Sequence, residues 1–207
     1  MPAPDIKGNI QKAVADLQRL YSRTLPVKLG TKAVSLTKQR FSESGYNGKK
    51  WEDPYRRKLS FKGTAGRNGT LLSGNNHLRD STYFKPEPGK VYIRNQVEYG
   101  AIHNYGGTIT VTAKMKRYFW YRHAEAKGAR PTKKKGGLRK TKGNEALSRE
   151  AEFWRNMALK KVGSIIHMPQ RRFFGSDPGM EKELRKIIDT ELQKFIKQYG
   201  EHFRGTR

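Results

Sequence analysis

The sequence contains no cysteine, which excludes disulfide bonds and cysteine-ligated zinc and suits a reducing cytoplasm. Acidic residues are scarce, with 18 against 44 lysines and arginines, so the formal net charge is +26. Such a field attracts polyanions, including DNA, RNA, anionic lipid and acidic protein surfaces. No apolar run approaches the roughly 20 residues that span a bilayer, and residues 1–5 lack the features of a signal peptide. We therefore expect a soluble protein, made and used inside a cell.

Apolar residues occur at helical spacing near the N-terminus, although they make up only 34% of the 207 residues. The first predicted helix leaves charged residues such as Asp16 to solvent, and its apolar face comprises Ile6, Ile10, Val14, Leu17 and Tyr21. A second helix is predicted from Pro26. Its near-heptad stripe could pack in the core or on a neighbouring subunit, and core packing is favoured. That stripe comprises Val27, Gly30, Val34, Thr37 and Phe41.

Glycine and proline divide the middle of the chain. Residues 42–70 predict a long irregular loop, docked through Trp51 and neighbouring aromatic residues. Residues 78–84 and 90–95 predict two antiparallel strands around a turn at 86–89. In the second strand, Val91 and Ile93 are expected to face the core.

A short helical pattern that begins at Tyr99 is followed by Gly106-Gly107 and a β-branched run ending at Thr112. The two glycines supply the positive φ angles that end a helix, so a helix-to-strand corner is predicted. Residues 113–123 are aromatic and basic without a turn signal. They favour a helix over a continued strand, with inward positions at Met115, Phe119 and Trp120.

Residues 127–143 are basic, contain glycine, proline and threonine, and include no acidic residue. Such a run cannot bury enough apolar surface to fold alone, so we expect a polyanion, a partner or another subunit to order it. The residues expected to contact DNA or a partner are Lys133, Lys134, Lys135, Arg139, Lys140 and Lys142. Helical spacing resumes at Asn144, and 162–168 predicts a strand. Asp177-Pro178 predicts the start of a C-terminal amphipathic helix that runs to about residue 200.

No catalytic constellation is present. The five histidines are scattered, and neither a phosphate-binding loop nor a nucleophile elbow occurs. We therefore predict no catalytic residue, no metal site and no cofactor. The basic and aromatic composition suits a nucleic-acid surface, and it suits an acidic protein neighbour equally well.

Four motifs occur in order before the C-terminal helix. They are Gly48-Lys-Lys-Trp51, Leu72-Ser-Gly74 with Leu78-Arg-Asp-Ser81, Tyr99-Gly-Ala-Ile-His-Asn-Tyr-Gly106, and Met168-Pro-Gln-Arg-Arg-Phe-Phe-Gly175. Over roughly residues 5–199 the chain resembles the phage virion morphogenesis or tail completion family, the Mu-like and P2-like proteins. It departs from the family pattern at Gly100, at Asn104-Tyr105, in the spacing lengthened by Asn75-Asn76, and in an enlarged segment between the last two motifs.

The resemblance implies that the motif positions are structural. These positions are Trp51, Ser73, Gly74, Leu78, Ser81, Tyr99, His103, Gly106, Pro169, Arg171, Phe174 and Gly175. The expected fold is α+β, a single domain over 1–207 with two N-terminal helices, a central antiparallel sheet and a C-terminal amphipathic helix. The loop at 42–70 and the basic extension at 127–143 are expected to make subunit contacts.

The expected function follows from the same resemblance. It implies a non-enzymatic protein of the virion neck that completes the tail and allows head–tail joining, as a hexameric ring around the DNA channel. Its expected partners are further copies of itself, neck or connector proteins, tail tube or terminator proteins, and genomic DNA, with no membrane. Assembly would take place in the host bacterial cytoplasm. The chief alternative is a basic protein that binds nucleic acid without sequence specificity, and a metal-dependent nuclease is less favoured.

Overall fold

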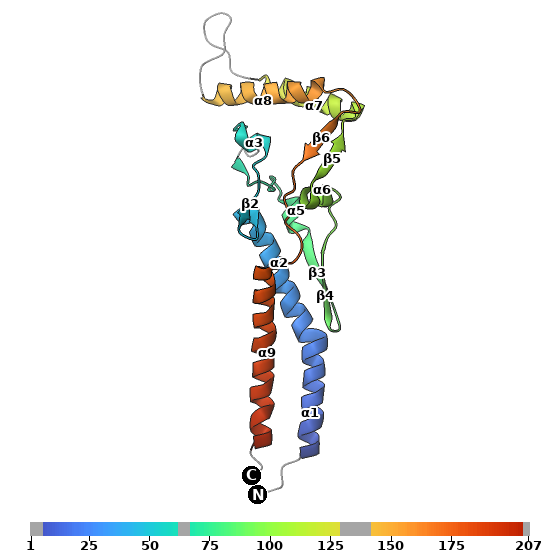
Figure 1. The fold of residues 1–207 in the computed structure, drawn as a ribbon, viewed down its shortest axis with the longest axis vertical. Coiled ribbons are helices and arrows are strands. Elements are labelled where there is room, and N and C mark those ends of the chain that lie inside the picture. The colour runs from blue at the N-terminus through green and yellow to red at the C-terminus, as the bar shows by residue number, and fades with distance from the viewer. Residues whose placement is uncertain (1–5, 62–66, 129–141, 205–207) are drawn as a thin grey trace, which may run out of the picture. The chain divides into compact units, whose positions relative to one another are not determined.

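The computed structural model describes residues 6–61, 67–128 and 142–204. In chain order its elements are α1 (Ile6–Arg19), the π-helical turn η1 (Leu20–Thr24), α2 (Leu25–Glu43), β1 (Gly45–Tyr46), β2 (Lys49–Lys50), α3 (Tyr55–Lys58), α5 (His77–Asp80), β3 (Thr82–Glu87), β4 (Lys90–Asn95), α6 (Gly100–Tyr105), β5 (Gly107–Thr110), α7 (Ala113–Ala126), α8 (Lys142–Leu159), β6 (Ile165–Met168) and α9 (Pro178–Arg204) (Figure 1). The predicted α+β class is confirmed. None of the helices within the described ranges combines the length and the apolar character needed to cross a membrane.

The residues form two compact units, each assembled from separate segments of the chain. The first, which we call the helical unit, comprises Met1–Gln39, Asp80–Gln96 and Phe174–Arg207. The second, the mixed unit, comprises Arg40–Arg79 and Val97–Phe173. The single-domain boundaries expected from the sequence stay a prediction.

The described strands form three two-stranded antiparallel sheets, where the sequence suggested one central sheet. β3 pairs with β4 in the helical unit, and β5 pairs with β6 in the mixed unit. The third pair, β1 with β2, is only two residues long on each side. The strands are therefore sorted by unit instead of being gathered into a single layer.

The two predicted N-terminal helices form, and they are continuous through η1. In this turn the Leu25 N–H donates to the Leu20 carbonyl, five residues back. In a regular α-helix the ring of Pro26 would clash with the carbonyl of Ser22, four residues earlier. The wider π turn relieves this clash, so the buried Pro26 is accommodated at the start of α2.

Most of the α2 stripe packs inward, as favoured. Thr37 and Phe41 are buried, Val34 is half-buried, and a side chain at Gly30 would overlap the ring of Phe84 on β3. Val27, at the start of the same stripe, is exposed. The core of the helical unit therefore lies between α2, β3 and the inner face of α9.

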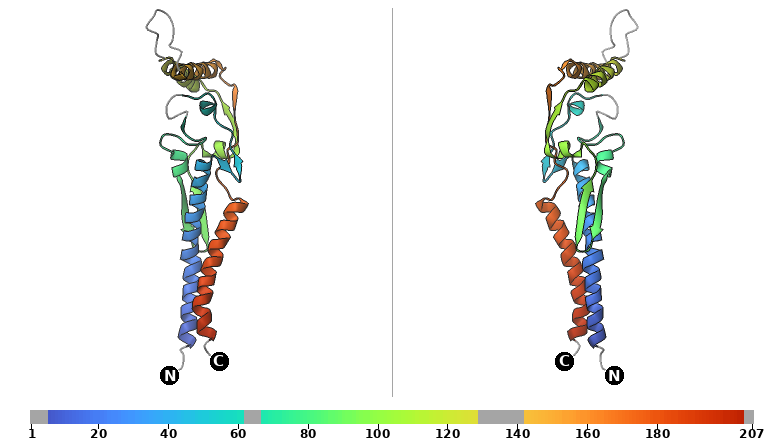
Figure 2. Two further views of the ribbon diagram at one scale, coloured as in Figure 1. Left: turned by 90° about the vertical axis from the view of Figure 1, so that its left-hand side faces the viewer. Right: turned by 90° about the vertical axis from the view of Figure 1, so that its right-hand side faces the viewer.

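α9 runs alongside the N-terminal helices in the helical unit (Figure 2). Its predicted start is confirmed, because Asp177 Oδ1 accepts a hydrogen bond from the Met180 N–H at 2.8 Å. Near its other end, the Tyr199 hydroxyl donates to the carboxylate of Asp16 on α1. Asp16 is therefore half-buried and not turned to solvent as expected, because this hydroxyl gives its carboxylate a partner away from water.

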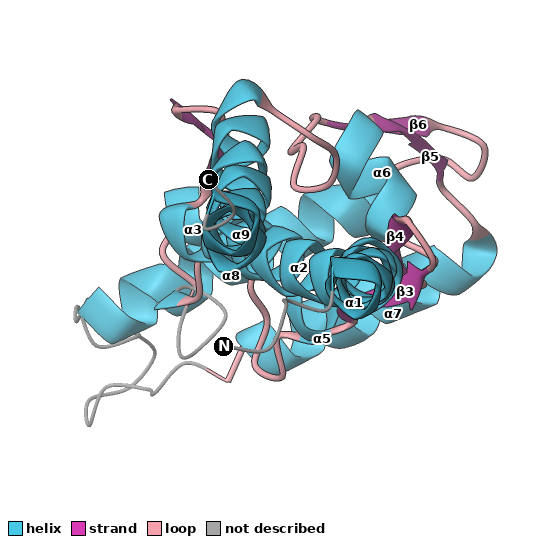
Figure 3. Ribbon diagram, turned by 90° about the horizontal axis from the view of Figure 1, so that it is seen from below, coloured by secondary structure: helices cyan, strands magenta, loops and turns pink. Residues whose placement is uncertain are grey.

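The β3–β4 hairpin lies on the other side of α1 and α2 from α9 when the helical unit is viewed end-on (Figure 3). Glu87 pairs with Lys90, so the turn consists of Pro88 and Gly89. Gly89 has a φ of +69°, and a Cβ there would overlap the ring of Tyr21. Glycine is thus required both by the backbone conformation and by the close approach of a ring.

The strands of this hairpin confirm one expectation and correct another. Val91 and Ile93 are the more buried positions of β4, as predicted. The preceding strand begins at Thr82 and not at residue 78, because residues 77–80 form α5. The Asn75 side chain accepts a hydrogen bond from the His77 N–H at 3.3 Å, a local bond that favours a helical turn over a strand here.

In the mixed unit the predicted corner is confirmed. α6 ends at Gly106, whose φ is +72°, and β5 then pairs with β6 from Gly107 opposite Met168 onward. β6 is shorter than the predicted strand over 162–168. The chain turns at Gly163, where φ is +88° and the N–H donates to the Val111 carbonyl at 2.9 Å.

α7 packs against α8 (Figure 1), so the helical alternative for 113–123 is confirmed. Thr112 caps α7, because its hydroxyl oxygen accepts a hydrogen bond from the Met115 N–H at 3.2 Å. Phe119 is buried as predicted, whereas Trp120 is 43% exposed. A helix turns by about 100° per residue, so when Phe119 faces α8 the side chain of Trp120, the next residue, does not.

Candidate functional site

Three aromatic rings from distant parts of the chain form the centre of the mixed unit. Phe41 is fully buried, and its ring lies 5.1 Å from that of Phe173 and 5.9 Å from that of Trp51. The Phe41 and Trp51 rings meet edge to face at 79°, a favourable arrangement for aromatic pairs. We call Phe41, Trp51 and Phe173, with Asn104 and Arg171, the motif cluster.

Hydrogen bonds hold the backbone of residues 170–173 from several sides. The Trp51 indole N–H donates to the Arg172 carbonyl at 3.0 Å, and Arg40 donates to the Phe173 carbonyl at 2.9 Å. The Phe173 N–H donates to the Asn104 side chain at 2.9 Å. The two bonds to Phe173 are buried, so each satisfies a polar atom that water cannot reach, and the bond from Trp51 is partly buried.

Arg171 and His103 join the segment to α6. The Arg171 N–H donates to the His103 carbonyl at 2.7 Å, and its guanidinium Nε donates to the Glu52 carbonyl at 2.8 Å. Burial lowers the pKa of His103, and the charge of Arg171 lowers this pKa further. Within the described residues, the buried His103 Nδ1 has no hydrogen-bond partner. The imidazole is therefore neutral at physiological pH and faces a cation, an arrangement unlike that of a general base paired with a carboxylate.

Tyr46 lies between two arginines in the same unit. The guanidinium of Arg40 lies 4.5 Å from the centre of its ring, and that of Arg172 lies 4.6 Å from it. Both cations are within the range of cation–π attraction. The ring thus attracts both guanidinium groups, and these contacts hold β1 beside the motif cluster.

Arg56 fixes the predicted loop over 42–70. Its guanidinium donates to the carbonyls of Asn68, Gly69, Thr70 and Leu72. Trp51 and Phe61 are buried, so the expectation of a docked loop is confirmed for the described part, in which short elements β1, β2 and α3 also form. Residues 62–66 of this loop lie outside the described residues.

Gly106 is required at its position for two reasons. Its positive φ is one, and the other is that a Cβ would lie 3.1 Å from both the Gln170 N and the Met168 O. The chain after β6 therefore passes directly over the end of α6. The glycine allows the backbone approach that brings Arg171 to His103.

A groove of about 740 Å³ opens beside the motif cluster within the mixed unit. Its lining is mainly aromatic and apolar, with Tyr55, Phe153 and Met157 among the residues. Its two carboxylates are each paired, Glu52 with Lys58 and Asp53 with Arg57. In the described parts of the chain, no group of three or more acidic, histidine or cysteine residues could hold a metal ion. The groove thus presents apolar surface and no arrangement for metal or acid–base chemistry.

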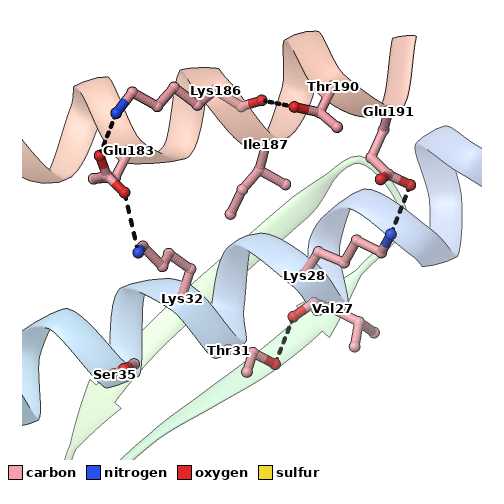
Figure 4. A pocket seen from close by; sticks show the side chains of 10 residues that line it. All are labelled: Val27, Lys28, Thr31, Lys32, Ser35, Glu183, Lys186, Ile187, Thr190 and Glu191. Carbon is pink, nitrogen blue, oxygen red and sulfur yellow. Dashed lines mark hydrogen bonds and ion pairs between the residues drawn. The ribbon is translucent and has the colours of Figure 1, made fainter. Parts of the chain in front are cut away.

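A second, shallower groove of about 580 Å³ runs between α2 and α9 in the helical unit. Glu183 on α9 bridges Lys186 and Lys32, and farther along α9 Glu191 pairs with Lys28 (Figure 4). Hydrogen bonds from the two lysines lower the pKa of Glu183 to about 2. Ile187 lies between these ion pairs (Figure 4). The groove is therefore the place where α2 and α9 meet, with ion pairs along its edge.

A family model for the phage virion morphogenesis family matches residues 6–193 of the chain. The chain belongs to this family. No curated protein and no solved structure matches the chain. As a phage virion morphogenesis protein, it is a virion-associated protein with a role in phage structure and assembly.

Half of the predicted motif positions of this virion morphogenesis protein lie in or next to the motif cluster. They are Trp51, Tyr99, His103, Gly106, Pro169 and Arg171. Tyr99 is half-exposed, with its ring edge-on to that of His103 at 6.0 Å. The cluster is thus where two of the four motifs and the tryptophan of a third meet.

The remaining motif positions lie elsewhere. Ser73 bonds locally to the Asn75 side chain at 2.8 Å, and a Cβ at Gly74 would meet nothing within 4 Å. Leu78 is buried, and Ser81 is partly buried. Two further positions, Phe174 and Gly175, belong to the helical unit. Of the six basic positions, Lys133, Lys134, Lys135, Arg139 and Lys140 lie outside the described residues, and Lys142 is the exposed first residue of α8.

Sequence patterns did not identify several residues that build the cluster. Phe173 and not Phe174 is the ring buried against Phe41, and Asn104 and Arg40 make the decisive buried hydrogen bonds. No local signal identifies Arg40, because a charged residue next to a buried helix position normally points to solvent. No local signal identifies Asn104, because its partner is 69 residues away in the chain.

Proposed function

We propose that this virion morphogenesis protein completes the end of the tail and allows it to join the head, as a non-enzymatic homo-oligomeric ring in the neck through which DNA passes. The family resemblance and the absence of a catalytic constellation from the described residues support this. The observation that carries the proposal is an exposed apolar stripe on α1.

The stripe comprises Ile10, Val14 and Leu17 of α1 and continues into η1 with Tyr21, and each residue is between 44% and 60% exposed. Their spacing of four, three and four residues is that of the a and d positions of a heptad repeat. α1 uses its other side, where Asp16 meets Tyr199, to contact α9. Tyr21 meets the β3–β4 hairpin at Gly89, and the other three residues of the stripe, Ile10, Val14 and Leu17, are left exposed among the described residues of one chain.

The residues that flank the stripe favour another copy of this chain as its partner. Heptad positions beside the stripe are occupied by Gln11, Ala13 and Gln18, all uncharged. In a chain of net charge +26, an uncharged strip of this kind removes repulsion at the place where two copies would meet. A β-branched residue at Val14 and a leucine at Leu17 suit the a and d positions of paired helices.

A matched pair of variants tests the assembly. Val14→Glu places a charge in the stripe, and Ala15→Glu places the same charge on the next exposed residue of α1. We expect sedimentation velocity to show an oligomer for the wild type and for Ala15→Glu, and monomers for Val14→Glu with an unchanged circular dichroism spectrum. A wild type that stays monomeric at every concentration, or two variants that behave alike, would refute the ring through α1.

The place in the particle needs a separate experiment. A phage that lacks this gene is grown and its lysate imaged by negative stain. Filled heads beside unattached tails, some of abnormal length, are expected if the protein completes the tail. Joined but empty particles would overturn this position and would instead indicate a role with DNA.

A further inference from the structure

We propose that the outer face of α7 binds nucleic acid, with its cations on the phosphates and its aromatic rings against bases or sugars. This goes beyond the position in the neck and does not depend on it. The face comprises Lys114, Arg117, Tyr118, Trp120, Tyr121 and Lys127, and we call it the α7 face.

Exposed aromatic rings are the first observation. Tyr118, Trp120 and Tyr121 are between 43% and 59% exposed, although each belongs to a well-formed helix whose other side is packed. Phe119 and His123 fill the contact with α8, and the His123 Nδ1 lies 2.8 Å from the Ala151 carbonyl. Tyr118 also meets Trp154 of α8 edge to face at 6.0 Å, and Trp120 meets His123 at 5.6 Å, so these two rings lie at the edge of the α7–α8 contact with much of their surface still exposed.

Cations flank these rings along the helix, with Lys114 and Arg117 before them and Lys127 after them. Lys114, Arg117 and Tyr121 follow at spacings of three and four residues, and Trp120 and Lys127 lie two turns apart beside them. Within the described part of the chain, the three cations Lys114, Arg117 and Lys127 have no ion-pair partner. From Lys114 to Lys127 the helix rises about 20 Å, which is the length of about six nucleotides of one strand.

The only acidic residue on α7 is engaged within the two helices. Glu125 pairs with Arg122 at 3.2 Å and accepts a hydrogen bond from the Tyr121 hydroxyl at 2.7 Å. Arg122 also pairs with Glu150 on α8, so this arginine serves two carboxylates, and neither carboxylate pairs with Lys114, Arg117 or Lys127. The α7 face is thus left with unpaired positive charge.

The exposed side of α8 is different and serves as an internal comparison. Its charges alternate in sign, with Arg149 and Arg155 near Glu145 and Glu152. Its two rings are packed, Trp154 on Phe119 of α7 and Phe153 on Tyr55 and Phe61. An acidic protein partner would supply carboxylates for the cations of the α7 face but no planar groups for its rings. Nucleic acid supplies both a phosphate for each cation and a π-face for each ring, which favours it as the ligand.

Three double variants separate this face from the general charge of the protein. Lys114→Gln/Arg117→Gln removes two cations from the α7 face, and Arg149→Gln/Arg155→Gln removes two from α8 as the control. Trp120→Ala/Tyr121→Ala removes two rings and no charge. Binding to fluorescein-labelled 20-nucleotide DNA, as duplex and as single strand, is measured by anisotropy over a series of salt concentrations.

Loss of the α7 cations is expected to reduce the slope of log K against log salt by about 1.8 on duplex and about 1.4 on single strands, because each phosphate contact contributes about 0.9 or 0.7. The α8 control is expected to keep the wild-type slope. Loss of the rings is expected to weaken binding at least about fivefold at constant slope. A loss confined to single strands would assign the rings to base stacking, and a loss on both forms would assign them to contacts along the groove.

The inference fails if the α7 cation variant matches the α8 control, or if the ring variant binds both forms as the wild type does. Either result would mean that DNA is held by the net charge alone, or by another part of the surface. Because these assays use purified protein, their failure leaves the proposed role in tail completion untouched. Conversely, joined particles in the phage experiment would not affect the α7 result.

Discussion

Replacing Phe173 with alanine should destabilise the mixed unit more than the same change at its neighbour Phe174. Phe173 is 2% exposed and packs on the ring of Phe41, so its removal leaves a cavity at the centre of the motif cluster. Core replacements of phenylalanine by alanine cost about 3–5 kcal/mol of unfolding free energy. With a urea dependence of about 2 kcal/mol per molar, the unfolding midpoint would fall by about 2 M.

Tryptophan fluorescence is the appropriate assay, because all three tryptophans (Trp51, Trp120 and Trp154) belong to the mixed unit. The indole of Trp51 also donates to the carbonyl of Arg172, so this signal reports on the cluster itself. The matched control is Phe174→Ala, which makes the same chemical change in the helical unit. If this control lowers the fluorescence-detected midpoint as much as Phe173→Ala does, the packing described for the cluster is wrong.

Three further predictions concern single features of the two units. The helical unit should lose stability between pH 6 and pH 2, because the pKa of Glu183 in the folded protein is about 2, below the ordinary carboxyl value, so protonation removes a stabilising charge. Urea titrations of the wild type and of Glu183→Gln at each pH should show a weaker pH dependence for the variant. Gly89→Ala should lower the free energy of unfolding by about 1–2 kcal/mol because of the positive φ alone, and by more if the ring of Tyr21 must move. Thermal unfolding followed by circular dichroism measures this loss. Thr112→Ala should cost about 1 kcal/mol by removing the cap of α7, whereas Thr112→Ser should restore it; equal losses for both would show that the cap is not the cause.

Local signals in the sequence were sufficient for the elements whose causes are local. Asp177 followed by proline identified the start of α9, because a cap acts on the N–H groups of the next few residues. Gly106 identified the corner, because a positive φ is a property of one residue. The alternation around Val91 and Ile93 identified the buried side of β4, because successive side chains of a strand point to opposite faces.

Features that depend on distant partners were beyond these signals. The hydrogen bond from Arg40 to the Phe173 carbonyl joins residues 133 positions apart, so no spacing in the sequence predicts it. Helical periodicity likewise identified the apolar side of 113–123 but wrongly placed Trp120 on the buried side, because the width of the buried side depends on how α8 lies against α7. β3 to β6 were recognised with shifted ends, whereas β1 and β2 lie in the stretch predicted as an irregular loop, and the division into three pairs depends on which unit each strand joins.

The exposed stripe on α1 shows most clearly what periodicity in the sequence cannot predict. Periodicity establishes that Ile10, Val14 and Leu17 share one face, but it contains no information on which chain covers that face. Within one chain α1 turns this face outward and uses a narrower contact, through Asp16, against α9. Burying an aliphatic side chain contributes about 1.5–3 kcal/mol, whereas one hydrogen bond such as that from Tyr199 to the half-buried Asp16 contributes about 1 kcal/mol, so a monomeric protein would gain stability by burying the stripe instead. The outward stripe is therefore better explained as surface kept for assembly than as a core that failed to close, and the comparison of Val14→Glu with Ala15→Glu distinguishes the two. If both variants were equally soluble and equally monomeric, the stripe would be only an exposed helix face.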